Sequence, residues 1–168
     1  SYMFHSTIRD SFLAKMGKEL SECIIIIDEG HNLPARVREI MRVQLTSTTI
    51  KYAIKEAKKF GYVNLIEQLT GLQNIFLAFT EKLRSKSGFG SGEMLIAQQE
   101  FSGAVNAIRD YDELIADYQT VGDAIRGVQR RSFIAGITSF LEAWKLGKEE
   151  GFSRIFSVKP GHEEVMVL

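Results

Sequence analysis

A chain of 168 residues with 45% hydrophobic and 25% charged residues has an ordinary globular composition and can bury one sizeable core. Lysine and arginine equal aspartate and glutamate at 21 residues each, which excludes a uniformly basic nucleic-acid binder and leaves only local patches for such contacts. The single cysteine, Cys23, excludes an internal disulfide and a four-thiolate iron–sulfur site, and no apolar run is long enough to span a bilayer.

The first 42 residues predict a helix, a buried strand and a second helix. Apolar residues at helical spacing and a terminal glycine predict a helix over residues 7–17 (Ile8, Phe12, Leu13, Met16 and Gly17). The four isoleucines Ile24–Ile27 lack the alternation of a half-exposed strand and favour a central parallel strand covered on both faces. Asn32 and Pro34 then predict the cap and first turn of another helix.

Two carboxylates and a histidine follow the isoleucine run directly. At the carboxyl edge of a parallel sheet, Asp28 is placed to hold the magnesium ion that neutralises the phosphates of a nucleoside triphosphate. Glu29 can orient or deprotonate the attacking water, and His31 can link the phosphate site to whatever grips the substrate. The pattern predicts the Walker B corner of a nucleotide-driven motor, with Asp28 and Glu29 as nucleotide-binding residues. The alternative interpretation is an ordinary turn after a strand, where aspartate and glycine are common.

The middle of the chain predicts four amphipathic helices. Ser47 or Thr48 and Gly61 mark the two ends of the first, over residues 47–60. The other three carry broad apolar stripes, from Tyr62 to near Gly88, from Phe101 to Ile125, and from Phe133 to Trp144 with Gly147 or Gly151 near its end. These stripes favour core packing over a cofactor site between helices. The wet side of the third helix is acidic (Asp110, Asp112, Glu113 and Asp117), and the glycine-rich segment 85–92 predicts a flexible tip.

The last residues predict two short strands, Ile155–Val158 and Glu164–Leu168, around a turn at Pro160-Gly161. Strand-bearing ends that flank a helical middle are typical of an insertion carried by the sheet of another domain. We therefore expect a mainly α fold, with four or so amphipathic helices attached to short strands of a RecA-like α/β motor domain. We also expect the chain to be a fragment of a larger protein.

Residues Ile24–Pro34 resemble the strand, DEAH-type box and following Asn-Leu of the archaeal XPD-type DNA helicases of superfamily 2. The opening Tyr2-Met3-Phe4-His5, with Ile8-Arg9, is similar to the segment that precedes this box. The helices that follow agree in order and length with the inserted Arch domain of that family. The resemblance implies that residues 1–42 are part of motor domain 1, that 43–160 form the Arch domain, and that 161–168 return to motor domain 1. Gly30 departs from the usual alanine but leaves the chemistry intact.

The resemblance implies an ATP-dependent DNA helicase that moves 5′ to 3′ in nucleotide excision repair, with the Arch domain helping to enclose single-stranded DNA. Glu29 and His31 would be catalytic, and Asp28 would be the magnesium-associated carboxylate. The implied cofactors are Mg²⁺, ATP and a 4Fe–4S cluster whose cysteines are not in this chain. The implied partners are single-stranded DNA and other repair proteins, and no membrane association is implied. The implied location is the cytoplasm of a prokaryote, in association with the nucleoid. Because the chain has no phosphate-binding Gly-Lys-Thr loop, we expect it to be inactive on its own.

Two clusters of cations are candidates for DNA contact. Lys82, Arg84 and Lys86 precede the glycine-rich tip, and Arg126, Arg130 and Arg131 precede the last helix. The competing hypothesis is a protein–protein interaction module of a related iron–sulfur helicase, with Phe89, Met94 and Leu95 as apolar anchors. Salt-sensitive binding of single strands favours the first function, and a salt-insensitive complex with another polypeptide favours the second.

Overall fold

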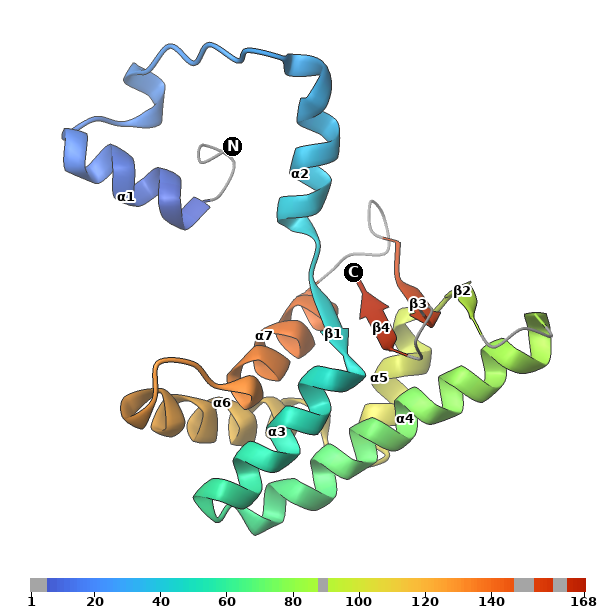
Figure 1. Ribbon diagram of the computed structural model, residues 1–168. Coiled ribbons are helices and arrows are strands. Elements are labelled where there is room, and N and C mark those ends of the chain that lie inside the picture. The colour runs from blue at the N-terminus through green and yellow to red at the C-terminus, as the bar shows by residue number, and fades with distance from the viewer. Residues whose placement is uncertain (1–5, 88–90, 147–152, 159–162) are drawn as a thin grey trace. The chain divides into compact units, whose positions relative to one another are not determined.

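The computed structural model describes residues 6–87, 91–146, 153–158 and 163–168. The described residues are mainly helical, as expected, and carry one small antiparallel sheet. The chain divides into two units, Ser1–Arg42 and Val43–Leu168 (Figure 1). Tyr2–His5, Phe89, Gly147, Gly151 and the Pro160-Gly161 turn lie outside the described residues.

The first unit contains α1 (Ser6–Met16) and α2 (Leu33–Met41), with short 3₁₀ turns η2 (Leu20–Glu22) and η3 (Gly30–Asn32) between them. Helix α1 ends as predicted at Gly17, which takes the left-handed conformation with φ +62° that glycine adopts without strain. Asn32 and Pro34 begin α2 as predicted, although the Asn32 side chain makes no capping hydrogen bond. Val37 and Ile40 are half-buried on one face of this helix.

The predicted central strand at Ile24–Ile27 is wrong for this chain. The four isoleucines pair with no strand among the described residues, and Ile24 and Ile26 are 94% and 90% exposed. A buried parallel strand needs a neighbour on each side to bond its N–H and C=O groups, and the described part of this unit offers none. The attachment to a RecA-like sheet therefore stays a prediction.

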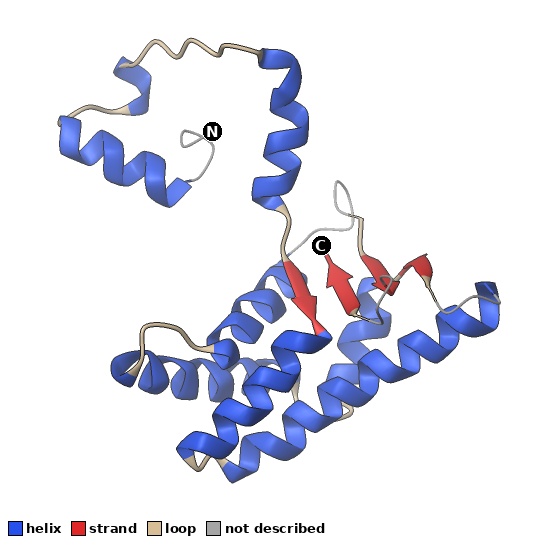
Figure 2. Cartoon of the chain, in the orientation of Figure 1, coloured by secondary structure: helices blue, strands red, loops and turns tan. Residues whose placement is uncertain are grey.

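The second unit carries the sheet, whose strands are β1 (Gln44–Thr46), β2 (Gly92–Leu95), β3 (Ile155–Val158) and β4 (Glu164–Val167). The strand order is β1-β4-β3-β2 and every pair is antiparallel. Figure 2 shows the strands together on one side of the helices. The two predicted strands at the end of the chain are confirmed as β3 and β4. Strands β1 and β2 were missed, because β1 has only three residues and β2 begins at Gly92, inside the segment predicted as a flexible tip.

The described residues of this unit also form five helices: α3 (Ser47–Phe60), α4 (Val63–Ser87), α5 (Gln98–Asn106), α6 (Tyr111–Val128) and α7 (Phe133–Leu146). The predicted positions of α3, α4 and α7 are confirmed. The cap of α3 is Thr46, one residue before the predicted Ser47 or Thr48, and its hydroxyl accepts from the backbone N–H of Thr49 at 3.0 Å. Gly61 ends α3 in the left-handed conformation, as predicted.

The single helix predicted from Phe101 to Ile125 is wrong, because the chain breaks between α5 and α6. Asp110 Oδ1 accepts from the backbone N–H groups of Asp112 and Glu113, at 3.0 and 3.1 Å. The Asn106 side chain accepts from Tyr111 N at 2.9 Å. Short polar side chains that bond nearby backbone donors compete with the helix and start a new one, and this local chemistry overrides the continuous apolar stripe.

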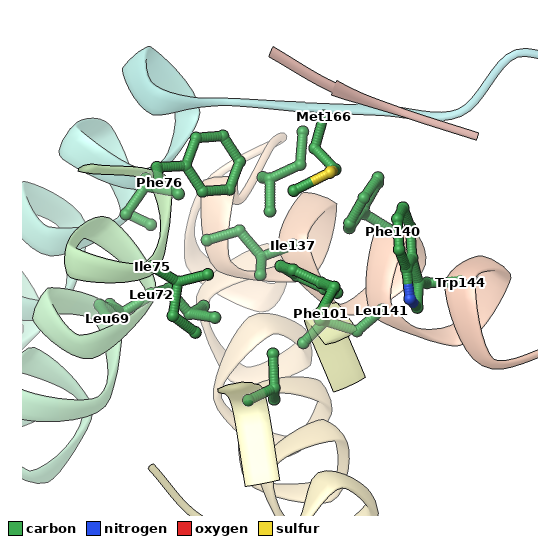
Figure 3. Close-up of a cluster of buried hydrophobic side chains, with 14 of the residues drawn as sticks. Leu69, Leu72, Ile75, Phe76, Phe101, Ile137, Phe140, Leu141, Trp144 and Met166 are labelled. Atoms are coloured by element: carbon green, nitrogen blue, oxygen red, sulfur yellow. The ribbon is translucent and has the colours of Figure 1, made fainter. Parts of the chain in front are cut away.

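The apolar stripes meet in one core, which fills the space between the helices and the inner face of the sheet (Figure 3). Phe101, Phe140 and Trp144 form its aromatic centre, with the rings of Phe101 and Trp144 4.8 Å apart. Met166 of β4 is fully buried against these helices. Dense packing of this kind gives the second unit a rigid frame on which exposed side chains keep fixed positions.

Candidate nucleotide corner and nucleic-acid interface

Asp28, Glu29 and His31 lie on an exposed turn that leads into α2. Asp28 Oδ1 accepts from the backbone N–H of Glu29 at 2.9 Å, and Asn32 N donates to Glu29 O at 3.0 Å. His31 Nδ1 lies 3.1 Å from Glu29 Oε2, so the turn brings two of the three predicted residues together. Their predicted position at the carboxyl end of a buried strand is not found, since no sheet edge is present in the described part of this unit.

Glu29 has a left-handed backbone, with φ 54° and ψ 42°, the one positive φ of a non-glycine residue in the described ranges. This conformation is uncommon for residues with a side chain and is found at turns and functional sites. Gly30 has no such requirement, because a Cβ built on it would meet no atom closer than 4.0 Å. An alanine, as in the family that this segment resembles, would therefore fit.

The oxygen donors at this turn fit a magnesium–nucleotide site. Magnesium in such sites takes one or two carboxylates and completes its shell with phosphate oxygens and water. Asp28 and Glu29 are exposed and can supply those carboxylates. In the described ranges no three His, Cys, Asp or Glu residues gather as an all-protein metal site, and the sole cysteine does not fit a 4Fe–4S cluster.

The cations at the end of α4 are largely neutralised by acidic neighbours. Lys82 forms an ion pair with Glu100 of α5, and Arg84 pairs with Glu81 at 2.8 Å. Lys86 makes no ion pair with the residues that the structure describes. This first predicted cluster therefore offers little net charge to a phosphate backbone.

The cations between α6 and α7 are more available. Arg126 pairs weakly with Asp123, at 3.4 Å, while Arg130 and Arg131 form no ion pair within the described ranges. The three arginines line a hollow of about 380 Å³ together with Ser132, Phe133 and Gly136. The structure thus gathers the second predicted cluster around one concave surface.

A buried carboxylate holds this loop in place. Glu56 of α3 is 5% exposed, and its two oxygens accept from Gln129 Nε2 at 2.7 Å, Ser132 Oγ at 2.9 Å and Ile134 N at 3.0 Å. The carboxylate therefore sits at the start of α7, where unsatisfied backbone donors and the helix dipole favour a negative charge. The Gln129 amide also donates to Arg131 O at 2.8 Å, which fixes the backbone that carries the arginines.

Sequence reasoning missed the aromatic residues beside this hollow. It assigned Phe133 to the core stripe of α7, yet Phe133 is 44% exposed and stacks on Tyr52 of α3, with centroids 5.0 Å apart and planes inclined by 23°. Lys55 places its ammonium 5.3 Å from the centre of the Tyr52 ring. The available signal was the spacing of Tyr52, Lys55 and Lys59 on the helix face that carries Glu56.

One comparison with known proteins bears on the first unit. Residues 1–50 match the DEAD_2 family. The matched segment includes the Asp28–His31 turn, and the match supports a helicase-family domain with helicase or ATPase activity in general. It covers less than a third of the chain: it reaches β1 and the first turn of α3, and helices α4 to α7 lie outside it. None of the described helices combines the length and the apolar character needed to cross a membrane.

Proposed function

We propose that this chain is part of an XPD-type ATP-dependent DNA helicase that moves 5′ to 3′ in nucleotide excision repair. In this proposal residues 1–42 belong to the motor, and the helical unit is an Arch-type domain that helps to enclose single-stranded DNA. The observation that carries the proposal is the DEAD_2 match over residues 1–50, with Asp28-Glu29-Gly30-His31 inside it. The pairing of Val43 with Leu168, which exchange backbone hydrogen bonds of 3.0 and 2.9 Å, supports an inserted domain whose two ends lie together.

The turn supplies the chemistry through its own side chains. Asp28 would hold a magnesium ion bound to the nucleotide, which neutralises charge on the phosphates. Glu29 would accept a proton from the attacking water or orient it. The contact between His31 and Glu29 would make the position of the base sensitive to what His31 touches on the DNA side.

Replacing Glu29 by glutamine in the full-length helicase tests the proposal. An amide cannot accept the proton of the attacking water, so DNA-stimulated ATP hydrolysis should fall roughly 10²- to 10⁴-fold. Nucleotide binding, followed with a fluorescent ATP analogue, should remain. Glu39→Gln is the matched control, because Glu39 is exposed on α2 and forms no ion pair with the described residues. Equal hydrolysis in wild type and Glu29→Gln would overturn the assignment.

Two further outcomes are expected in the same assay. Gly30→Ala should keep most of the activity, because the turn has room for a methyl group. The 168-residue chain by itself should hydrolyse no ATP, because it lacks the lysine and backbone cradle that hold the phosphates. A magnesium-dependent ATPase in the purified chain that disappears in Glu29→Gln would contradict this expectation.

A second candidate function is a protein-docking module of a related iron–sulfur helicase. Leu95 at the end of the edge strand β2 is 76% exposed, which favours this candidate, whereas Met94 is half-buried against the core. The predicted acidic face is less available than expected, since Arg109 pairs with Glu113 and Asp117 at 3.2 and 3.1 Å and Lys145 pairs with Asp112. A complex with a repair protein that survives high salt and is lost in Leu95→Ser would support this candidate.

A further inference from the structure

An exposed aromatic pair adjoins the arginine hollow on the second unit. In the described part of this unit, Tyr52 and Phe133 are the aromatic residues that leave close to half of their surface in contact with solvent. Their stacked rings come from different helices, α3 and α7, which pack side by side (Figure 1). Both helices belong to the packed core, so the pair is held on a rigid frame.

The surroundings of the pair are cationic. Lys55 lies over the Tyr52 ring, and Lys59 donates to Gln129 at 3.4 Å, beside the loop that carries Arg130 and Arg131. The Glu56 carboxylate is buried beneath this surface and fully engaged by three donors, so it does not oppose an incoming anion directly. Asp123 is exposed and pairs with Arg126 at 3.4 Å.

The geometry separates the roles of the two rings. Lys55 lies over the Tyr52 ring, whereas Phe133 is among the residues that line the hollow with the three arginines. A planar ligand can therefore stack on Phe133, which Tyr52 supports from behind, while an attached anion reaches the guanidinium groups. A base linked to its phosphate has this combination of a flat apolar face and an adjacent negative charge.

We propose that Phe133, supported by Tyr52, is a stacking platform for one base of single-stranded DNA, and that Arg130 and Arg131 hold the neighbouring phosphates. The choice of DNA rests on the proposed helicase function, and the stacking geometry stands without it. Bases inside a duplex are already stacked on each other, so the platform should prefer single strands. Stacking on an aromatic ring does not depend on the identity of the base, so the preference should be for strand form and not for sequence.

Binding of two oligonucleotides of equal charge tests the platform. Fluorescence anisotropy would compare a labelled oligothymidylate of about 15 nucleotides with an abasic strand of the same length, using the 168-residue chain at low salt. Wild type should bind the strand with bases roughly tenfold more tightly, since one stacked base contributes about this factor or more. Phe133→Leu should remove that difference while leaving abasic binding unchanged. Failure to bind, or the same preference in Phe133→Leu, would overturn the proposal.

The role of Arg130 and Arg131 can be tested separately through the salt dependence of binding. Arg130→Gln with Arg131→Gln should weaken the binding of both strands and lower the slope of log Kd against log salt by about 1.4, because two contacts to single-strand phosphates are lost. The matched control, Arg36→Gln with Arg38→Gln, removes the same charge from two exposed arginines of α2 and should change binding much less. Equal losses from the two double variants would overturn the assignment of the phosphates to Arg130 and Arg131.

Gly136→Glu tests the site with a variant that should fold as well as the wild type. A Cβ at Gly136 would meet no atom within 4 Å, and glutamate favours a helix more than glycine does, so α7 should be at least as stable. The new carboxylate enters the arginine hollow and should lower affinity for single strands at least tenfold. Unchanged affinity in a folded Gly136→Glu variant would contradict the site. Thermal unfolding of each variant verifies that it is folded.

The ATPase and DNA-binding results together distinguish failure of this inference from failure of the proposed function. Binding of other polymers tests whether single-stranded DNA is the ligand. A platform that binds DNA in a protein whose Glu29→Gln variant keeps full ATPase activity would sustain the inference and reject the proposed function. Loss of ATPase in Glu29→Gln with no effect of Phe133→Leu would do the reverse. Tighter binding of an RNA strand, or of a polyglutamate chain, than of DNA would reject single-stranded DNA as the ligand.

Discussion

Two buried tyrosines on α6 differ in whether their hydroxyl group has a hydrogen-bond partner. Tyr111 Oη donates to the carbonyl of Leu141 at 3.0 Å. Tyr118 is fully buried, and its hydroxyl has no hydrogen-bond partner among the described residues. Burying a polar group without a partner costs free energy that a hydrogen bond would offset.

Phenylalanine at each of these positions should therefore have opposite effects. Tyr118→Phe should leave the free energy of unfolding unchanged or raise it by up to about 1 kcal/mol, whereas Tyr111→Phe should lower it by about 1 kcal/mol. Urea unfolding at pH 7 measures both values. A larger loss in Tyr118→Phe than in Tyr111→Phe would indicate that the Tyr118 hydroxyl has a partner, such as a buried water.

The same two tyrosines should make the free energy of unfolding depend on pH in the alkaline range. Burial raises the pKa of Tyr118 and of Tyr111 above the ordinary value of 10.0, with the neighbouring Asp117 and Asp112 acting in the same direction. The folded state then keeps protons that the unfolded chain releases, so this contribution is complete below pH about 10 and falls as the pH rises further. The urea midpoint of Tyr118→Phe should decline less steeply above pH 10 than that of wild type.

The buried carboxylate of Glu56 accepts three hydrogen bonds at the start of α7. Glu56→Ala should lower the free energy of unfolding by about 3 kcal/mol, because three donors at the start of α7 lose their acceptor. Glu56→Gln retains one acceptor oxygen and should lose about 1 kcal/mol. Glu67→Ala, at an exposed position on α4, serves as the control and should change stability by less than about 0.5 kcal/mol.

At the scale of the elements, the contact between α6 and α7 depends on a small residue. A Cβ at Gly122 of α6 would lie 2.9 Å from the Ala135 Cβ and 3.0 Å from its backbone, so the two helices approach closely there. Backbone atoms cannot move aside as the end of a flexible side chain can. The close approach brings the start of α7, and with it Phe133 and the arginine loop, against α6.

Alanine at two helical glycines should separate packing from propensity. Gly122→Ala should lower the free energy of unfolding by about 1–3 kcal/mol through overpacking against Ala135. Gly136→Ala should raise it by about 0.5–1 kcal/mol, since its Cβ meets open space and alanine favours the helix. Thermal unfolding followed by circular dichroism measures both, and a stabilised Gly122→Ala would show that the helices can separate at little cost.

At the scale of the whole molecule, the two units differ in how much they bury. The second unit holds nearly all the buried hydrophobic residues, whereas Leu13 is the one described residue of the first unit in that class. The Ile24–Ile27 segment has no backbone hydrogen bonds to other described residues. A segment without such bonds exchanges its amide hydrogens rapidly.

Hydrogen–deuterium exchange should therefore distinguish the chain from the full helicase. In the 168-residue chain, peptides covering residues 24–29 should exchange fully at the earliest times, while those from α4, α6 and α7 stay protected. In the full-length protein the same 24–29 peptides should become protected, because a neighbouring strand of the motor would bond them. Rapid exchange of these peptides in both proteins would contradict a role as a central strand.

The sequence by itself determined those features that depend on local chemistry. The periodic apolar stripes of α4 and α7, the glycines that end α1 and α3, and the two carboxylates with a histidine before α2 could all be recognised from residue type and spacing. Asn106 and Asp110 were the sequence signal for the break between α5 and α6, but the apolar stripe that continues across them predicted a single helix. Membership of a buried parallel strand could not be derived for Ile24–Ile27, because it requires neighbours that the described residues lack.

Only the tertiary structure decided which predicted cations stand together and which are neutralised. Lys82 and Arg84 meet Glu100 and Glu81, while Arg130 and Arg131 gather beside an aromatic pair whose members are 81 positions apart in the sequence. The physical reason is that the charge and exposure of a surface depend on which helices pack against each other. In this unit the buried Glu56 of α3 determines that arrangement by capping α7, and a spacing rule applied to one helix at a time cannot reveal it.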